Sequence, residues 1–169
     1  IQMNATNPIA YGTVVSVTAI PGSGWLFDHW AGDVSGSNNP VSVMMTGPQS
    51  VVAVFVQITY PVTASTSGGG QVDVSPVQGP YPSGSVASVS ATASNGWTFM
   101  QWQGDASGTD NPLNLIVDGP KSVSAVFGTQ VGTGVIGSGV IELNATNLVA
   151  YGTLVRATAV PNYGSYFVQ

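Results

Sequence analysis

The sequence lacks cysteine and is poor in charged side chains, above all in cations. It contains no Cys, two Lys or Arg residues and seven Asp or Glu residues, which gives a net charge of −5 at pH 7. Without Cys there is no disulfide framework, thiolate metal site or Cys nucleophile. Lys121 and Arg156 are too few to neutralise a run of phosphates, so we expect no nucleic-acid binding.

Long apolar runs are missing as well. No stretch reaches the length of a membrane-spanning helix, and the shortage of cations argues against an anionic membrane surface, so we expect no membrane insertion. Hydrophobic residues make up 43% of the 169 residues, which is enough for a core. With 22 Gly and 11 Pro residues, the chain is also rich in the residues that form turns.

Self-similarity is the strongest positive signal in the sequence. Residues 12–55 align without a gap with residues 84–127. Residues 144–167 match residues 4–27 closely. We therefore divide the chain into three modules: repeat 1, residues 1–57, whose first strand is missing; repeat 2, residues 58–128, which is complete; and repeat 3, residues 129–169, which is incomplete at its C-terminal end.

The hydrophobic pattern has the period of β-strands. Val15, Val17 and Ala19 alternate with Ser16 and Thr18, as in a half-buried strand. In repeat 2 the same reading predicts strands near residues 60–66, 71–75, 84–92, 97–102, 113–117 and 121–127, with the first of them recurring at 131–136 in repeat 3. No helical apolar stripe of useful length is present.

Glycine-rich segments separate the first two expected strands of the later repeats. Gly68-Gly69-Gly70 and Gly137-Ser138-Gly139 are typical of hairpin turns. The predicted fold class is all-β, as tandem small β modules that are either β-sandwich-like or helix-poor and β-grasp-like. We expect these modules to form a linear array.

Two motifs recur in repeats 1 and 2: Gly-Trp-x-Phe-x-x-Trp-x-Gly-Asp-x-Ser-Gly-x-x-Asn-Pro, and Ser-Val-x-Ala-Val-Phe near the end of each repeat. They resemble the divergent internalin-type B-repeat, in two nearly full copies and one partial copy. The resemblance implies a small β-rich module that is arranged in arrays in large bacterial surface or secreted proteins. The related B-repeats have a β-grasp-like fold, and the family has no shared catalytic site.

Catalytic groups are sparse. His29 is the single histidine, and Gln101 and Gln169 take its place in the other repeats. Asp28 is likewise replaced, so no pair of facing carboxylates recurs. Since a general base needs a partner in reach of a substrate, we expect no enzymatic activity and no cofactor.

The recurring loop around Asp33 and Asp105 allows two interpretations. Its carboxylate, hydroxyl and amide oxygens could bind calcium. Alternatively, the Asp and Asn side chains accept hydrogen bonds from nearby backbone N–H groups and fix the turn. Repeat 1 has a single carboxylate in this loop, and repeat 2 adds only Asp110. We favour the turn and predict no metal site.

Aromatic residues occupy two kinds of position. Phe27, Phe99 and Phe167 recur in all three repeats, and Trp30 and Trp102 in two. Because one aromatic side chain buries much area in a small module, these five are predicted core anchors, together with Phe55 and Phe127.

Trp25 and Trp97 form the second kind, because repeat 3 has Ser165 at their position. A position that accepts Ser is expected to lie near the surface. An indole there could stack on a sugar ring or pack against a neighbouring module. We favour packing between modules and name both residues as the candidate ligand or module-interface site.

The sequence therefore predicts a non-enzymatic structural repeat of a bacterial extracellular fibre, stalk or surface adhesin. The expected partners are other copies of the chain or neighbouring repeat modules, held through strand edges and module interfaces. The alternative is a carbohydrate-binding module of a secreted or surface protein. Incomplete modules at both ends predict unpaired strand edges, so that residues near 1–10 or 131–169 pair with an adjacent chain.

Overall fold

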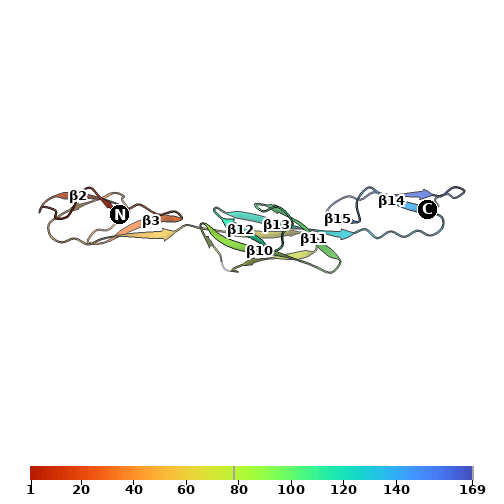
Figure 1. Cartoon of the computed structure of the whole chain (residues 1–169), viewed down its shortest axis with the longest axis horizontal. Helices are drawn as coiled ribbons and strands as arrows, with labels where there is room; N and C mark the ends of the chain where they lie inside the picture. The colour runs from red at the N-terminus through yellow and green to blue at the C-terminus, as the bar shows by residue number, and fades with distance from the viewer. Residues whose placement is uncertain (78, 169) are drawn as a thin grey trace. The chain divides into compact units, whose positions relative to one another are not determined.

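The computed structural model describes residues 1–77 and 79–168, which form β-strands and no helix (Figure 1). No helix that could span a membrane is present in these residues. The strands are β1 Gln2–Met3, β2 Val14–Thr18, β3 Trp25–Gly32, β4 Val41–Met44, β5 Val51–Gln57, β6 Thr59–Tyr60, β7 Val62–Ser67, β8 Gly70–Ser75, β9 Tyr81–Pro82, β10 Ser85–Ala93, β11 Trp97–Gly104, β12 Leu113–Val117, β13 Lys121–Gln130, β14 Gly139–Leu143, β15 Leu148–Ala150 and β16 Ala157–Pro161. The predicted all-β class with tandem modules is confirmed.

The chain folds as two compact units. The first contains Ile1–Tyr60 together with Pro82–Gly84, and the second contains Pro61–Tyr81 and the residues from Ser85 onward. The first unit therefore holds repeat 1 and two short segments of repeat 2, residues 58–60 and 82–84. The second holds most of repeat 2 and the described part of repeat 3.

The first unit consists of two small sheets around a tryptophan. One sheet has the order β1-β2-β4, and the other pairs β3 with β5. The alternation in β2 places Val15 and Val17 in the core, where they are 1% and 3% exposed, and leaves Ser16 half-buried. Trp30 of β3 and Val43 of β4 are buried against them.

The second unit repeats this plan and extends it. In one sheet β10 lies between β8 and β12, and in the other β13 lies between β11 and β7 along most of its length. Between the sheets lies a buried core that includes Val89, Trp102, Leu115 and Phe127. Burial of these apolar side chains away from water is the main source of stability in a module this small.

The aromatic geometry is nearly the same in both repeats. The rings of Phe27 and Trp30 have centroids 5.0 Å apart, and the corresponding rings of Phe99 and Trp102 are 5.1 Å apart. The two tryptophans and Phe127 are fully buried, whereas Phe27, Phe99 and Phe55 are half-buried. The two tryptophans are thus the central anchors, and Phe27 and Phe99 pack on their flanks.

The prediction of a hairpin at Gly68-Gly69-Gly70 is wrong. β7 pairs in parallel with β13, whereas β8 pairs antiparallel with β10 in the other sheet. The glycines carry the chain from one sheet to the other across the end of the core. A Cβ on Gly70 would overlap the ring of Phe127, so a residue without a side chain is required at this crossing.

Repeat 3 differs from three predictions, because the hairpin expected at Gly137-Ser138-Gly139 does not form either. The expected strand at 131–136 does not form, and the first strand of this repeat is β14, which pairs with β16. Phe167 is 69% exposed instead of serving as a core anchor. In repeat 1 the corresponding Phe27 packs against the rings of Trp30 and Phe55, and Phe167 makes no such ring contact among the described residues.

Candidate functional site

Trp25 and Trp97 are the first residues of the equivalent strands β3 and β11. Each follows a glycine with positive φ, Gly24 or Gly96. The backbone N–H of each Trp closes a turn by donating to the carbonyl three residues earlier. Because the two strands start at the same point of the repeat, the two indoles occupy corresponding places in different units. Their surroundings differ.

Trp97 is half-buried at the contact between repeats 2 and 3. Its ring centroid lies 6.1 Å from that of Tyr151, with 47° between the ring planes. On the side of repeat 2 the indole lies against Gly68 and Gly69, where an added Cβ would overlap it. The absence of glycine side chains thus makes room for a large ring, and a tyrosine of the next repeat covers part of that ring.

β15 brings Tyr151 to this position. It extends the sheet of repeat 2 by pairing antiparallel with the end of β13, with Gly128 opposite Ala150 and Gln130 opposite Leu148 (Figure 1). Tyr151 then donates its backbone N–H to the Phe127 carbonyl at 3.0 Å. Repeats 2 and 3 are therefore joined by a shared sheet as well as by an aromatic contact.

Trp25 lacks these neighbours within its unit. It is 44% exposed. The segment of repeat 2 that belongs to the first unit donates the Ser83 N–H to the Ile58 carbonyl at 2.8 Å, and Ser83 packs beside Gly24. No aromatic ring pairs with Trp25 among the described residues, and Ser165, at the corresponding place in repeat 3, is exposed.

The recurring polar loop is held by its own side chains. The Asp33 carboxylate accepts the backbone N–H of Ser50 at 2.7 Å, and Asp105 accepts that of Ser122 at 2.6 Å. In each case the Ser carbonyl accepts the Asp backbone N–H at 2.8 Å. A Cβ on Gly104 would overlap the Ser122 carbonyl oxygen, so this close approach requires glycine there.

An asparagine ties the same loop to the core sheet. Asn39 accepts the Ala19 N–H at 2.9 Å and donates to the Ala19 carbonyl at 2.8 Å, and Asn111 does the same with Ala91 at 2.9 and 2.7 Å. The buried indoles donate to carbonyls of this loop at 2.8 Å. The polar motif thus provides hydrogen-bond partners for the backbone of the core sheet and for the buried indole N–H groups, as buried polar groups require.

The candidate catalytic residues do not assemble into a site. His29 has a neighbour that the sequence argument did not consider, because its Nδ1 donates to the Asp28 carboxylate at 2.7 Å. Both side chains are about half exposed, at 48% and 51%, and are adjacent in the sequence. Across residues 1–77 and 79–168, no group of three His, Asp or Glu side chains could hold a metal ion.

One ion pair distinguishes repeat 2 from repeat 1. Lys121 Nζ lies 2.5 Å from the Asp118 carboxylate. The hydrogen bond and the charge of Lys121 lower the pKa of Asp118, and the hydrogen bond to Asp118 raises the pKa of Lys121. The corresponding residues of repeat 1 are Thr46 and Gln49, which cannot form this pair.

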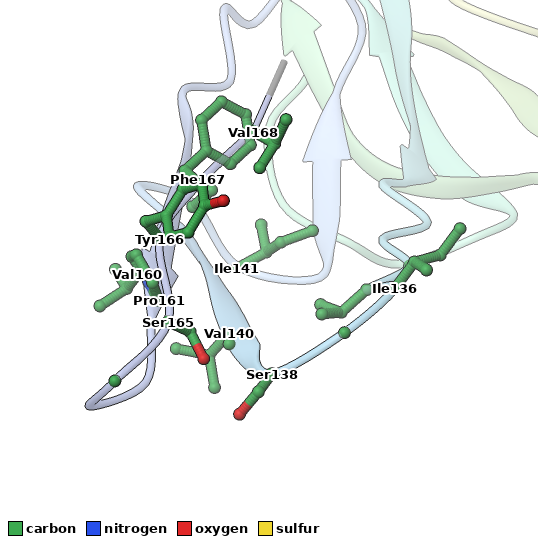
Figure 2. A pocket seen from close by; sticks show the side chains of 16 residues that line it. Ile136, Ser138, Val140, Ile141, Val160, Pro161, Ser165, Tyr166, Phe167 and Val168 are labelled. Carbon is green, nitrogen blue, oxygen red and sulfur yellow. The ribbon is translucent and has the colours of Figure 1, made fainter.

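Repeat 3 contains an open apolar hollow of about 530 Å³. Figure 2 shows Ile136 before β14 on one side of it, and Tyr166 and Phe167 on the other. Ile136 is fully exposed, and Tyr166 is 82% exposed. This hollow was not predicted from the sequence, in which Phe167 was expected to be a core anchor.

Comparison with known proteins gives one family. The model of the divergent InlB B-repeat domain matches residues 2–59 and residues 60–131. No curated protein and no solved structure matches the chain.

Proposed function

The chain belongs to the divergent InlB B-repeat domain family, which indicates a repeat module of a bacterial surface protein, and from this premise we propose that it acts as a non-enzymatic structural element of an extracellular fibre, stalk or adhesin. In this role consecutive repeats transmit force and set reach, and no repeat carries out chemistry. The observation that carries the proposal is the joining of β15 of repeat 3 to β13 of repeat 2.

This junction has the properties that a load-bearing array needs. Strand pairing makes the link through backbone hydrogen bonds, which depend little on side-chain identity. The stack of Trp97 on Tyr151 adds apolar burial at one point. Repeat proteins gain stability from such nearest-neighbour interfaces, so each added repeat can stabilise its neighbour.

Hydrogen exchange on the full chain tests the role of the junction. The substitution Trp97→Ala should speed exchange of the amides of Val149 and Tyr151, because the indole that supports β15 is lost. The core amides of β10 should keep their protection. Trp25→Ala is the matched control, and it should leave exchange in β15 unchanged.

Two further results decide the proposal. If Trp97→Ala leaves β15 as protected as in the wild type, the junction does not depend on this contact and the structural role loses its support. Labelling of intact bacteria with an antibody against the chain tests location directly. Labelling only after permeabilisation would contradict an extracellular role.

The exposure of Trp25 supports a second candidate function, which is carbohydrate binding. An indole that is 44% exposed can stack on a sugar ring. Titration with soluble bacterial and host polysaccharides, followed by tryptophan fluorescence, would detect this. Binding that Trp25→Ala abolishes would favour the carbohydrate module over the structural one.

A further inference from the structure

The turn that leads into β11 contains a chemically labile pair of residues. Asn95 precedes Gly96 there, and no other asparagine of the chain precedes a glycine. The side-chain amide of asparagine is open to attack by the backbone nitrogen of the next residue, and glycine has no side chain to hinder that approach. Repeat 1 has Ser23 at the equivalent position and repeat 3 has Tyr163, so the pair is specific to repeat 2.

The turn leaves both reacting groups accessible. Asn95 and Gly96 are exposed. The turn is closed by the Trp97 N–H, which donates to the Ser94 carbonyl at 3.0 Å, whereas the N–H of Gly96 donates to no other backbone group among the described residues. The nitrogen of Gly96 can therefore react without giving up a backbone hydrogen bond of the fold.

The reaction needs water and no other reagent. The Gly96 nitrogen forms a bond to Cγ of Asn95, the bond from Cγ to the side-chain nitrogen breaks, and ammonia leaves with the proton of Gly96. Water then opens the resulting cyclic imide, giving a hydroxyl to one of its carbonyls and a proton back to the Gly96 nitrogen. Opening at the side-chain carbonyl gives aspartate. Opening at the backbone carbonyl gives isoaspartate, in which the main chain runs through Cβ and Cγ.

The same turn contacts the junction of repeats 2 and 3. The carbonyl of Gly96 accepts the Thr129 hydroxyl at 2.9 Å. Thr129 lies opposite Trp97 on one side of β13 and opposite Val149 of β15 on the other. The ring of Trp97 in turn lies against that of Tyr151. The position of Gly96 is therefore linked to both the strand and the ring that join the two repeats.

Isoaspartate would change this link. It adds one methylene to the main chain between the Ser94 carbonyl and the Trp97 N–H, which now meet at 3.0 Å. With the longer main chain, this hydrogen bond and the bond from Thr129 to Gly96 cannot both keep their present geometry. The indole is thereby displaced from the place where it supports β15.

We propose that Asn95 deamidates spontaneously through Gly96 in the folded chain, and that isoaspartate at this position loosens the attachment of β15 to β13. The proposal rests on the structural role proposed above, for which it names a covalent regulation of the junction between repeats. Because the ammonia is lost, the change accumulates with the age of each molecule. Older molecules should then carry weaker junctions than newly made ones.

Asp118 provides an internal comparison, because it also precedes a glycine, Gly119, and could close the same ring. The hydrogen bond from Lys121 lowers the pKa of Asp118, so its carboxyl group stays ionised at neutral pH. An ionised carboxylate resists attack by a nitrogen nucleophile. Asp118 should therefore remain unmodified while Asn95 reacts.

Ageing of the full chain in neutral buffer, followed by mass spectrometry of its peptides, tests the reaction. The peptide that contains Asn95 should gain the mass difference between an amide NH₂ and a hydroxyl, and fragmentation by electron transfer should identify isoaspartate. The rate should rise with pH, because the Gly96 nitrogen must lose its proton to form the new bond. Asn95→Ser is the matched control, since it places the residue of repeat 1 in this turn, and it should stay unmodified.

Hydrogen exchange on the aged chain tests the consequence. The amides of Val149 and Tyr151 should lose protection in the modified wild type, while the core amides of β10 keep theirs. In aged Asn95→Ser, β15 should stay as protected as in the fresh protein.

The outcomes separate this proposal from the structural role. An Asn95 that remains intact in the folded chain overturns the proposal. So does isoaspartate that leaves exchange in β15 unchanged, or an equal loss of protection in aged Asn95→Ser. The structural role fails by a different result, which is a fresh Trp97→Ala variant with β15 as protected as in the wild type.

Discussion

Repeats 1 and 3 carry almost the same sequence and bury it to different extents. Both pair their first strand with the second in the same register, with Met3 opposite Val17 and Leu143 opposite Ala157. In both repeats an asparagine accepts a backbone N–H, from Ser16 of β2 at 2.9 Å in repeat 1 and from Arg156, directly before β16, at 2.7 Å in repeat 3. The local hydrogen bonds are therefore reproduced.

The burial of the second strand is not reproduced. Val17 and Ala19 are each 3% exposed, whereas the corresponding Ala157 and Ala159 of repeat 3 are exposed. In repeat 1 Trp30 and Val43, far along the chain, cover this face. The strand pairing in both repeats thus rests on residues within one short segment, whereas the burial of Val17 and Ala19 rests on residues that come later in repeat 1.

The largest expected effect comes from removing the buried aromatic anchor of repeat 2. Trp102→Ala should lower the free energy of unfolding of the second unit by about 3–5 kcal/mol, since a fully buried side chain leaves a cavity and an unpaired carbonyl at Asp110. Calorimetry of the full chain should show one transition moving to lower temperature. The control is Phe167→Ala, which should leave both transitions in place, because that ring is 69% exposed. Equal effects of the two substitutions would contradict the contrast between the repeats.

The next effect concerns the asparagine that ties the polar loop to the core sheet. Asn111→Ala should lower the free energy of unfolding by about 1–3 kcal/mol. Both hydrogen bonds to Ala91 are lost, which leaves the backbone N–H and carbonyl of Ala91 unsatisfied. Asn39→Ala should have a similar effect on the first unit. Asn144→Ala is the control from repeat 3, where one exposed hydrogen bond is lost, and chemical denaturation should show a smaller change. A loss for Asn144→Ala as large as that for Asn111→Ala would show that burial does not matter here.

A smaller effect follows from the ion pair that repeat 1 lacks. Lys121 lowers the pKa of Asp118, so the pair stabilises the fold above the ordinary pKa of Asp and loses this contribution as the pH falls through the lowered value. Asp118→Asn should therefore lower the melting temperature slightly at pH 7 and not at all in strong acid. The Asp118 side chain is 71% exposed, so added salt should shrink the difference. A difference that grows in acid would reverse this sign and refute the assignment.

The smallest effect should come from calcium. Asp33 and Asp105 already accept the N–H groups of Ser50 and Ser122, which leaves each loop with no cluster of free carboxylates. We expect neither millimolar calcium nor a chelator to change the melting temperature. A ligand that binds the folded state must raise it by mass action, so a clear rise that chelator reverses would mean that these loops hold a cation.

The strands and the aromatic core could be predicted from the sequence, because both depend on patterns within one repeat. The expected strand at 121–127 is found as β13 Lys121–Gln130, and the buried position of Trp102 follows from its recurrence. The hairpin at Gly68-Gly69-Gly70 was wrong because a turn sequence does not specify which sheet receives each strand. The contact of Trp97 with Tyr151 joins residues of different repeats, so no local pattern could indicate it.

The sequence by itself determined the all-β class, the repeat, the family and the self-contained polar loop. Each of these depends on residues that lie close together in the chain or recur at a fixed spacing. The tertiary structure decided which copies of a motif are buried and which edges are filled. Burial and edge pairing require a second surface, and whether that surface is present depends on strands elsewhere in the chain. For this reason Trp97 is covered by Tyr151 of the next repeat, while Trp25 is 44% exposed within the first unit.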